Sequence, residues 1–203
     1  TFGAVLFVQT LHLLFEYRSN RDSSRISQVM EIANKTVAHL RFGLNEESAM
    51  NTARIIWDHV PVAAVDLAGP ETVLAHLGVG DDHHEPGQPL RTKATRKVLS
   101  TGEPVFLRSK AAIGCDHPDC PLDSAVIVPL RKGGLIVGCL KLYGTEDIRL
   151  NKVHFELAKG LGDLFSTQLE LQDIQTQNQL LAKAEIRRLQ TQINPHFLFN
   201  ALN

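Results

Sequence analysis

The chain has 203 residues, 43% of them hydrophobic, so it is long enough for one globular domain with extensions. Its 21 basic and 22 acidic residues give a net charge of −1, which argues against a nucleic-acid partner because a nucleic-acid surface needs a basic face. Three cysteines are too few for a disulfide scaffold and favour a reducing compartment.

The first segment of the chain is apolar. TFGAVLFVQTLHLLF, residues 1–15, has no Asp, Glu, Lys or Arg, and three arginines follow by residue 25. Such a stretch is shorter than the roughly 20 residues that span a bilayer, but basic residues directly after an apolar segment mark the cytoplasmic side. We therefore expect residues 1–21 to end a transmembrane helix of the inner or plasma membrane, with residues from about 18 onward cytoplasmic. An amphipathic helix of the core or of a dimer is the alternative.

Two helices are expected next. Apolar residues recur three or four positions apart within residues 22–42, which predicts a helix with one buried stripe, and Gly43 suits its C-terminal cap. Asn45 can cap a second helix that runs to about His59, whose first-turn glutamates interact favourably with the helix dipole.

The pattern then changes to short strands. Residues 62–67 and 72–77 predict one β-hairpin, and residues 124–130 and 135–143 predict a second. Between the hairpins we expect a polar loop (78–89), a helix (90–100), a strand (104–108) and a loop with two cysteines (109–123). This order predicts an α+β fold, in which a single antiparallel sheet has helices packed to one side.

From Leu150 to Asn203 the pattern is helical, and Pro195 is the only proline in this stretch. A helix longer than about 25 residues is typical of a coiled coil or a bundle arm, so we expect a homodimer. The apolar stripe consists of Leu157, Leu161, Leu164, Leu171, Ile174, Leu181, Ile186, Leu189 and Ile193. Polar residues interrupt this stripe, and such interruptions can set register and oligomeric state.

Three stretches resemble one family. NPHFLFNALN, residues 194–203, is similar to the phosphoacceptor segment of LytS-type sensor histidine kinases. GDDHH (80–84) and CPLDSAVIVPL (120–130), the latter followed by GCLKLY (138–143), resemble the GAF-like sensor domain of these kinases. The resemblance covers essentially the whole chain. It implies a GAF-like antiparallel sheet flanked by helices.

The resemblance also implies a domain organisation and an activity. Residues 1–21 would leave the membrane, residues 22–149 would form a GAF-like sensor or relay domain, and residues 150–203 would form a signalling helix and the start of the dimerisation and phosphoacceptor domain. The full protein would autophosphorylate on His196 and pass the phosphoryl group to a LytTR-type response regulator. ATP and Mg²⁺ would bind an ATP-binding domain that these residues do not include, so the chain alone is expected to be inactive.

His196 would be the phosphoacceptor. A histidine ring with an ordinary pKa near about 6.5 is largely neutral in the cytosol, as a nucleophile must be. Gln192 and Asn200 lie four residues to either side, on the same helix face, and could orient the ring. Neither amide can act as a base, so any base lies outside this segment. Pro195 tends to kink the helix beside the acceptor.

A second group of residues has metal-ligating chemistry. His83 and His84 lie in one loop and Cys115 and Cys120 in another, and these residue types are ligands of zinc or iron. We expect the four to form a metal site if the loops fold together. Two alternatives remain open. The cysteines could close a reversible disulfide, or they could pack as small apolar residues while the histidines bond to loop backbone. Cys139 is expected in the core.

Two further hypotheses concern ligands and class. GAF-like domains often bind a small molecule, and Trp57, Arg91, Thr92 and Arg96 are candidate lining residues. The alternative to a kinase is a non-catalytic dimeric GAF-type module that senses a ligand, a metal or redox state, with the terminal helix as a coiled coil only. A gene that continues past Asn203 into a glycine-rich ATP-binding domain would favour the kinase.

Overall fold

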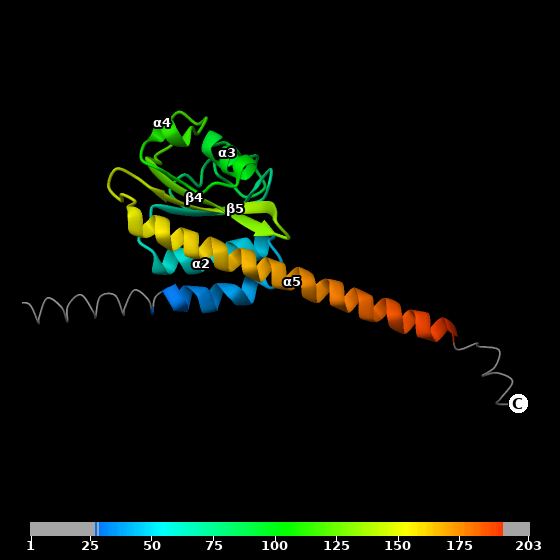
Figure 1. The fold of residues 1–203 in the computed structure, drawn as a ribbon. Helices are drawn as coiled ribbons and strands as arrows, with labels where there is room; N and C mark the ends of the chain where they lie inside the picture. Colours follow the sequence, from blue (N-terminus) through cyan, green and yellow to red (C-terminus); the bar gives the residue numbers. More distant parts are fainter. Residues whose placement is uncertain (1–26, 28, 193–203) are drawn as a thin grey trace, which may run out of the picture.

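The computed structural model describes residue 27 and residues 29–192 (Figure 1). The predicted membrane-exit segment, residues 1–21, and the predicted site residues His196 and Asn200 lie outside the described part of the chain. Among the described helices, none combines the length and the apolar character that crossing a bilayer requires.

Five strands form one antiparallel sheet in the order β2-β1-β5-β4-β3. The strands are β1 (Ala64–Ala68), β2 (Val73–Gly78), β3 (Val105–Leu107), β4 (Ser124–Lys132) and β5 (Leu135–Gly144). Both predicted hairpins form, and the pairing of β1 with β5 joins them into one sheet. The turn between β4 and β5 needs positive φ angles, which Gly133 and Gly134 supply at 58° and 78°.

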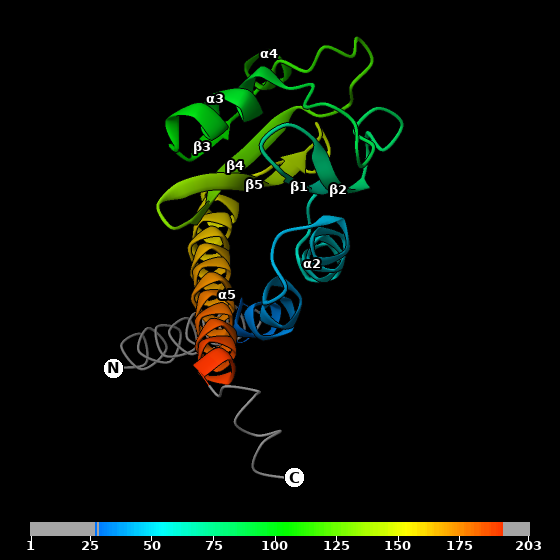
Figure 2. The same cartoon turned by 90° about the vertical axis from the view of Figure 1, so that its right-hand side faces the viewer.

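Helices cover both faces of the sheet (Figures 1 and 2). On one face lie the helical residues 29–40, α2 (Glu46–His59) and α5 (Lys152–Gln192); on the other lie α3 (Lys93–Thr101) and α4 (Lys110–Ile113). The α+β class and the flanking helices are confirmed, but the prediction that helices pack to one side is wrong. The physical reason is in β4 and β5, whose near-continuous apolar runs are typical of strands buried on both faces.

Alternate residues of the strands feed two separate cores. Val126 and Val128 of β4 face the α2 and α5 side and belong to one core with Leu161 and Phe165 of α5. The intervening residues of β4 face α3 and α4, where Ile127 belongs to the second core. The sheet is therefore the common wall of both cores.

The predicted helix boundaries have a local cause. Asn45 caps α2: its side chain accepts a hydrogen bond from the Ser48 amide, and the Ser48 hydroxyl accepts one from the Asn45 amide, both at 2.9 Å. Gly102 ends α3 with a φ of 72°, in the region that favours glycine. The helix before α2 ends at Leu40, and Gly43, with a φ of 91°, closes the turn that follows, where its amide donates to the carbonyl of Leu40. The predicted cap at Asn45 is therefore confirmed, whereas Gly43 lies three residues beyond the end of the helix that it was predicted to cap.

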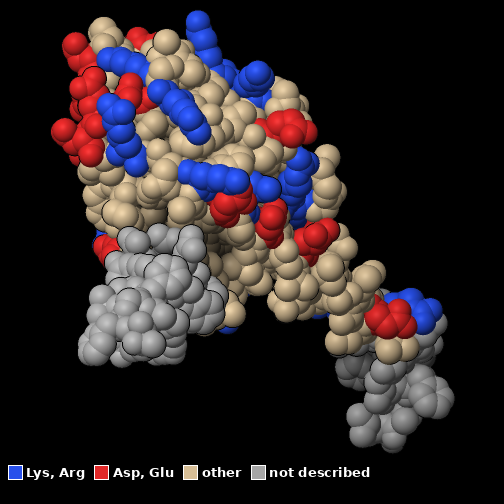
Figure 3. Space-filling model, turned by 60° about the vertical axis from the view of Figure 1, so that its left-hand side comes forward, with Lys and Arg blue, Asp and Glu red and all other residues tan. Residues whose placement is uncertain are grey.

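The helix α5 is 41 residues long, and at about 1.5 Å per residue it extends for about 60 Å. Its first half packs on the sheet through buried Ala158, Leu161, Phe165 and Leu169. Its second half leaves the domain (Figure 1) and exposes Leu171, Ile174, Leu180, Leu181, Ile186 and Leu189. Acidic and basic side chains lie side by side over the face of the molecule in Figure 3.

Three polar side chains lie within the sheet, on the face that α3 covers. Asp66 of β1 pairs in register with His76 of β2 and Lys141 of β5, and all three residues are buried. The Asp66 carboxylate lies 2.8 Å from Lys141 Nζ and 3.4 Å from His76 Nδ1. Burial opposes charge on both partners, but the mutual attraction prevails: it lowers the pKa of Asp66 and raises the pKa of Lys141.

Lys141→Met tests this buried pair. The substitution leaves the Asp66 carboxylate buried without its cation, so we expect the free energy of unfolding at pH 7 to fall by about 3–5 kcal/mol. In the variant, burial should raise the pKa of Asp66 above its unfolded value near about 3.9. The folded variant then binds more protons than its unfolded chain above this pH, so the loss of stability should shrink as the pH falls from about 7 to about 4.

Urea unfolding at several pH values measures this effect. The double variant Asp66→Asn/Lys141→Met is the control: it removes the unpaired charge, so its loss should be smaller and nearly independent of pH over this range. A penalty for Lys141→Met that stays constant with pH would contradict a charged Asp66 in the fold.

Candidate metal centre

A tight turn presents the two adjacent histidines. The amides of His83 and His84 both donate to the carbonyl oxygen of Gly80, at 3.3 and 3.0 Å. Gly80 has a φ of 90°, and a Cβ atom there would lie 3.2 Å from the His84 ring. Glycine therefore allows the chain to turn closely beneath both rings.

A short helix places the first cysteine. This helix, α4, has four residues and is too short for sequence periodicity to predict. It begins after Ser109, whose side chain accepts a hydrogen bond from the Ala112 amide. Gly114 ends it with a φ of 64°, and Cys115 follows in a β-bridge with Thr92. Cys120 lies further along the same loop, where its amide donates to the carbonyl of His117.

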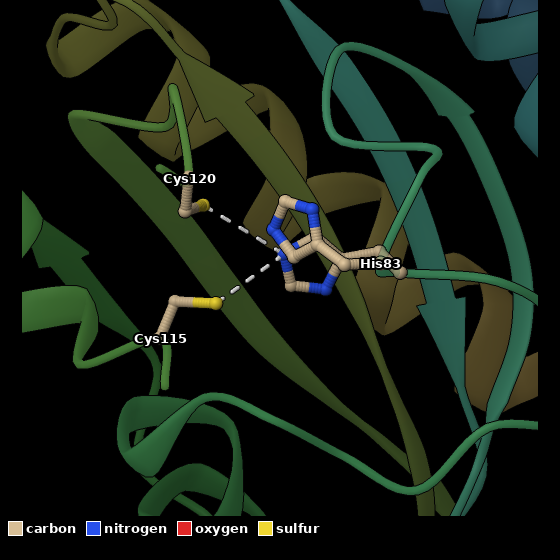
Figure 4. A group of neighbouring side chains, drawn as sticks. His83, Cys115 and Cys120 are labelled. Atoms are coloured by element: carbon tan, nitrogen blue, oxygen red, sulfur yellow. Dashed lines mark hydrogen bonds between the residues drawn. The ribbon is translucent and has the colours of Figure 1, made fainter. Parts of the chain in front are cut away.

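The four predicted ligands come together. The Nε2 atom of His84 lies 3.8 Å from the sulfur of Cys115 and 3.9 Å from the sulfur of Cys120. The ligand atoms of His83, His84, Cys115 and Cys120 all lie within 4.8 Å of one another. In Figure 4 the two cysteine side chains point from one side toward the imidazole rings, and the dashed lines mark the two sulfur–nitrogen contacts.

His83 has one nitrogen engaged and one without a partner. Its Nδ1 lies 2.6 Å from the carboxylate of Asp82, and this hydrogen bond is the main reason that the pKa of Asp82 is lowered. Its Nε2 is buried and has no hydrogen-bond partner in the part of the chain that the structure describes. A carboxylate that holds one ring nitrogen leaves the other as a lone-pair donor, as metal-bound histidines require.

The other ligands are in a dry environment. Burial lowers the pKa of His84 to about 4, so its ring is neutral at neutral pH. Burial also raises the thiol pKa of Cys120 to about 11. The His84 ring stacks on the ring of His76 with centroids 5.2 Å apart, which joins the site to the buried pair of Asp66 and Lys141.

Two contributors escaped the sequence analysis. Asp82 stands next to the histidines in the motif GDDHH, and its carboxylate fixes the orientation of His83. His117 stacks on His83 with ring centroids 4.1 Å apart, and Asp82, His83 and His117 form a second group of close ligand atoms. The position of His117 between the two cysteines was the available signal.

The remaining predicted residues have mixed outcomes. Cys139 is buried in β5, as expected, and burial raises its thiol pKa to about 12. Cys115 and Cys120 are free thiols, so no disulfide joins them here. Trp57 lies in α2, on the opposite face of the sheet from α3, which carries Arg96, so these two candidate lining residues do not share one pocket. Gln192 is the last residue of α5.

The architecture defines a class of domain, because solved GAF domains share it. The GAF domain of A. aeolicus nlh2 superposes with a TM-score of 0.54 at 14% identity, covering 71% of this chain and 96% of that one. The GAF domain of a phosphoenolpyruvate-protein phosphotransferase from Coxiella burnetii gives 0.56 at 13% identity, covering 70% and 93%. The described domain has the GAF fold, as its motifs predicted.

Similarity in sequence is more specific. The family model for histidine kinases matches residues 184–203. The chain is 41% identical to the sensor protein LytS of Bacillus anthracis over 203 residues, and 38% identical to the sensor histidine kinase/phosphatase LytS of Staphylococcus aureus over 201 residues. These matches cover 100% and 99% of this chain and 34% of each relative, so the chain spans about a third of their length. The predicted resemblance to LytS-type sensor kinases is confirmed.

The burial of the three thiols predicts their order of reaction. In metal-free protein we expect iodoacetamide to modify Cys115 first, because Cys115 is only half-buried, while the raised pKa values of Cys120 and Cys139 suppress their thiolates. Cys139 should react only when the protein unfolds. Peptide mass spectrometry against time, with and without denaturant, measures the three rates. Native-state modification of Cys139 as fast as that of Cys115 would contradict this arrangement.

Proposed function

We propose that this chain is the input domain and the first part of the phosphoacceptor helix of a membrane-bound, two-component sensor histidine kinase. The observation that carries the proposal is the match of residues 184–203 to histidine kinases, in a chain whose whole length is similar to LytS sensor proteins. Residues 1–21 would leave the membrane, residues 22–149 would be the sensor or relay domain, and residues 150–203 would lead into the catalytic half.

The chemistry would centre on His196. A ring nitrogen of His196 would attack the γ-phosphorus of ATP, the bond from that phosphorus to the β-phosphate oxygen would break, and ADP would leave. Positioning and neutralisation of phosphate charge supply most of the rate in such transfers. ATP and Mg²⁺ would bind the ATP-binding domain of the complete protein, and Gln192 and Asn200 would orient the His196 ring. The phosphoryl group would then pass to an aspartate of a LytTR-type response regulator.

The helix α5 offers a mechanical route from the sheet to His196. Its Ser166 hydroxyl accepts a hydrogen bond from the Arg131 amide of β4 at 2.9 Å and donates to the carbonyl of Gly162 at 2.7 Å. At Gly162 a Cβ atom would lie 3.0 Å from Val128 of β4, so the helix and the strand are in close contact. A shift of β4 would therefore move α5 and, through it, the acceptor.

A second candidate function is a non-catalytic, dimeric GAF-type module that senses a metal, a ligand or redox state. It is favoured by the convergence of two histidines and two cysteines from separate loops. In that case the segment around His196 would serve only as a coiled coil.

Labelled ATP separates the two functions. The full-length protein, incubated with γ-labelled ATP and Mg²⁺, should acquire label that is acid-labile and alkali-stable, as expected of phosphohistidine. His196→Gln should abolish this label, because glutamine keeps the size and polarity of the side chain but has no nucleophilic ring nitrogen. Equal labelling of both proteins, or no labelling of a folded protein that binds ATP, would contradict the proposal.

The exposed apolar stripe of α5 predicts a homodimer. Leu181 is 68% exposed and Ile174 is 50% exposed, so a partner helix would bury both. We expect Leu181→Glu to raise the dimer dissociation constant at least about tenfold, because burying a leucine contributes about 1.5–3 kcal/mol and 1.4 kcal/mol is a factor of ten. Sedimentation equilibrium measures this constant.

Thr176→Glu is the matched control for the dimer. It adds the same charge to an exposed position of the same helix, about 140° around the axis from Leu181 and away from the other stripe residues, and should leave the constant unchanged within about twofold. A monomeric parent protein, or equal effects of the two variants, would refute a dimer through this stripe.

A further inference from the structure

We infer that His83, His84, Cys115 and Cys120 bind one zinc ion, which would join the loop after β2 to the loop before β4. Two neutral imidazoles and two thiolates are a donor set that zinc prefers, and four protein ligands leave no open position. The inference concerns metal binding alone and does not depend on kinase activity.

The spacing of the ligand atoms fits a tetrahedral ion. Zinc–sulfur bonds of about 2.3 Å and zinc–nitrogen bonds of about 2.0 Å at tetrahedral angles separate neighbouring ligand atoms by roughly 3.3–3.8 Å. The two sulfur–nitrogen distances at His84 are 3.8 and 3.9 Å, and no pair among the four ligand atoms exceeds 4.8 Å. Contraction by at most about 1.5 Å would close the site around an ion.

An unpartnered buried atom points to the same ligand. The His83 side chain is 3% exposed, and its Nε2 has no hydrogen-bond partner among the described residues. A buried polar atom without a partner costs free energy, and a metal ion would remove that cost. The hydrogen bond from Nδ1 to the carboxylate of Asp82 already holds the ring in the tautomer that leaves Nε2 free to coordinate.

Charge balance suits this buried position. Zinc binding would displace one proton from each thiol, and the two thiolates would then neutralise the two positive charges of the ion. The resulting centre is neutral, so it avoids the large cost of burying a net charge. Asp82, the carboxylate that orients His83, is exposed, so water screens its negative charge.

A zinc ion explains the buried histidines better than a disulfide or simple core packing does. A disulfide between Cys115 and Cys120 would leave His83 and His84 without a role, although both rings are buried beside the sulfurs. If the residues were only packed core, Nε2 of His83 would stay buried without a hydrogen-bond partner among the described residues. A metal ion satisfies all four ligand atoms at once.

Metal content and metal titration test the inference. The chain is purified without a histidine tag or a chelator, reduced, and analysed by inductively coupled plasma mass spectrometry; a chelated sample is then titrated with Zn²⁺ and, separately, with Co²⁺. We expect one zinc per chain, and for Co²⁺ we expect the strong visible absorption of a tetrahedral site together with thiolate charge-transfer bands.

Variants distinguish ligands from neighbours. Cys115→Ser, Cys120→Ser, His83→Ala and His84→Ala should each abolish stoichiometric binding. Asp82→Asn should keep the tetrahedral cobalt spectrum but weaken zinc affinity about 10–100-fold, because Asp82 only orients a ligand. Cys139→Ala is the matched control, since it removes a thiol outside the site and should retain one zinc per chain.

Three results would overturn the inference. They are sub-stoichiometric zinc in the unmodified chain after reduction and titration, full zinc binding by Cys115→Ser or Cys120→Ser, and iron in place of zinc as the stoichiometric metal. The cobalt spectrum of the unmodified chain keeps the test decisive if a ligand variant fails to fold. None of these measurements involves ATP, so their failure is distinct from a failure of the proposed kinase function.

Discussion

The whole arrangement depends on the need of the central strands to bury two faces. The strands β4 and β5 are apolar at nearly every position, so water must be excluded from both sides of the sheet. The helices α2 and α5 cover one side, but α3 and the four-residue α4 are too small to cover the other alone. The loops at residues 79–92 and 109–123 complete that cover. Because these loops cover a face of the sheet, some of their polar side chains are buried. Histidines and cysteines of the two loops therefore become buried neighbours there.

The buried polar groups on the α3 face of the sheet contact one another in a series. Lys141 and Asp66 pair within the sheet, His76 contacts the same carboxylate, and the His84 ring stacks on His76 beside the two thiols. A buried polar group costs less free energy when a neighbouring group interacts with it. Removing one member of the series therefore leaves its neighbour buried without a partner. Such a series also specifies register, since a slip of one residue between β1 and β5 would separate Asp66 from Lys141.

Sequence reasoning succeeded where the determinant is local. Asn45 and Gly133 act through their own local geometry, so the start of α2 and the hairpin turn were predictable. The identity of the four possible ligands was also predictable, because few residue types bind metals. The presence of helices on both faces of the sheet was not predictable. Periodicity identifies the buried stripe of a helix, but it does not say on which face of the sheet the helix packs. The ion pair of Asp66 and Lys141 depends on strand register across 75 residues, and α4 is too short to show a period.

The helix α5 combines a fixed half with an unsupported half. From Ala158 to Leu169 it packs on the sheet through buried apolar side chains, while the described side chains from Ile174 to Leu189 are all exposed. Isolated helices gain little stability in water, so burial of these side chains against a partner helix would stabilise the second half. The cluster of His83, His84, Cys115 and Cys120 lies on the face of the sheet opposite α5, where the His84 ring stacks on His76 of β2. Cys120 lies only a few residues before β4, the strand on which α5 packs. In the proposed kinase, a change at this cluster would therefore reach α5 through β4, without a ligand near His196.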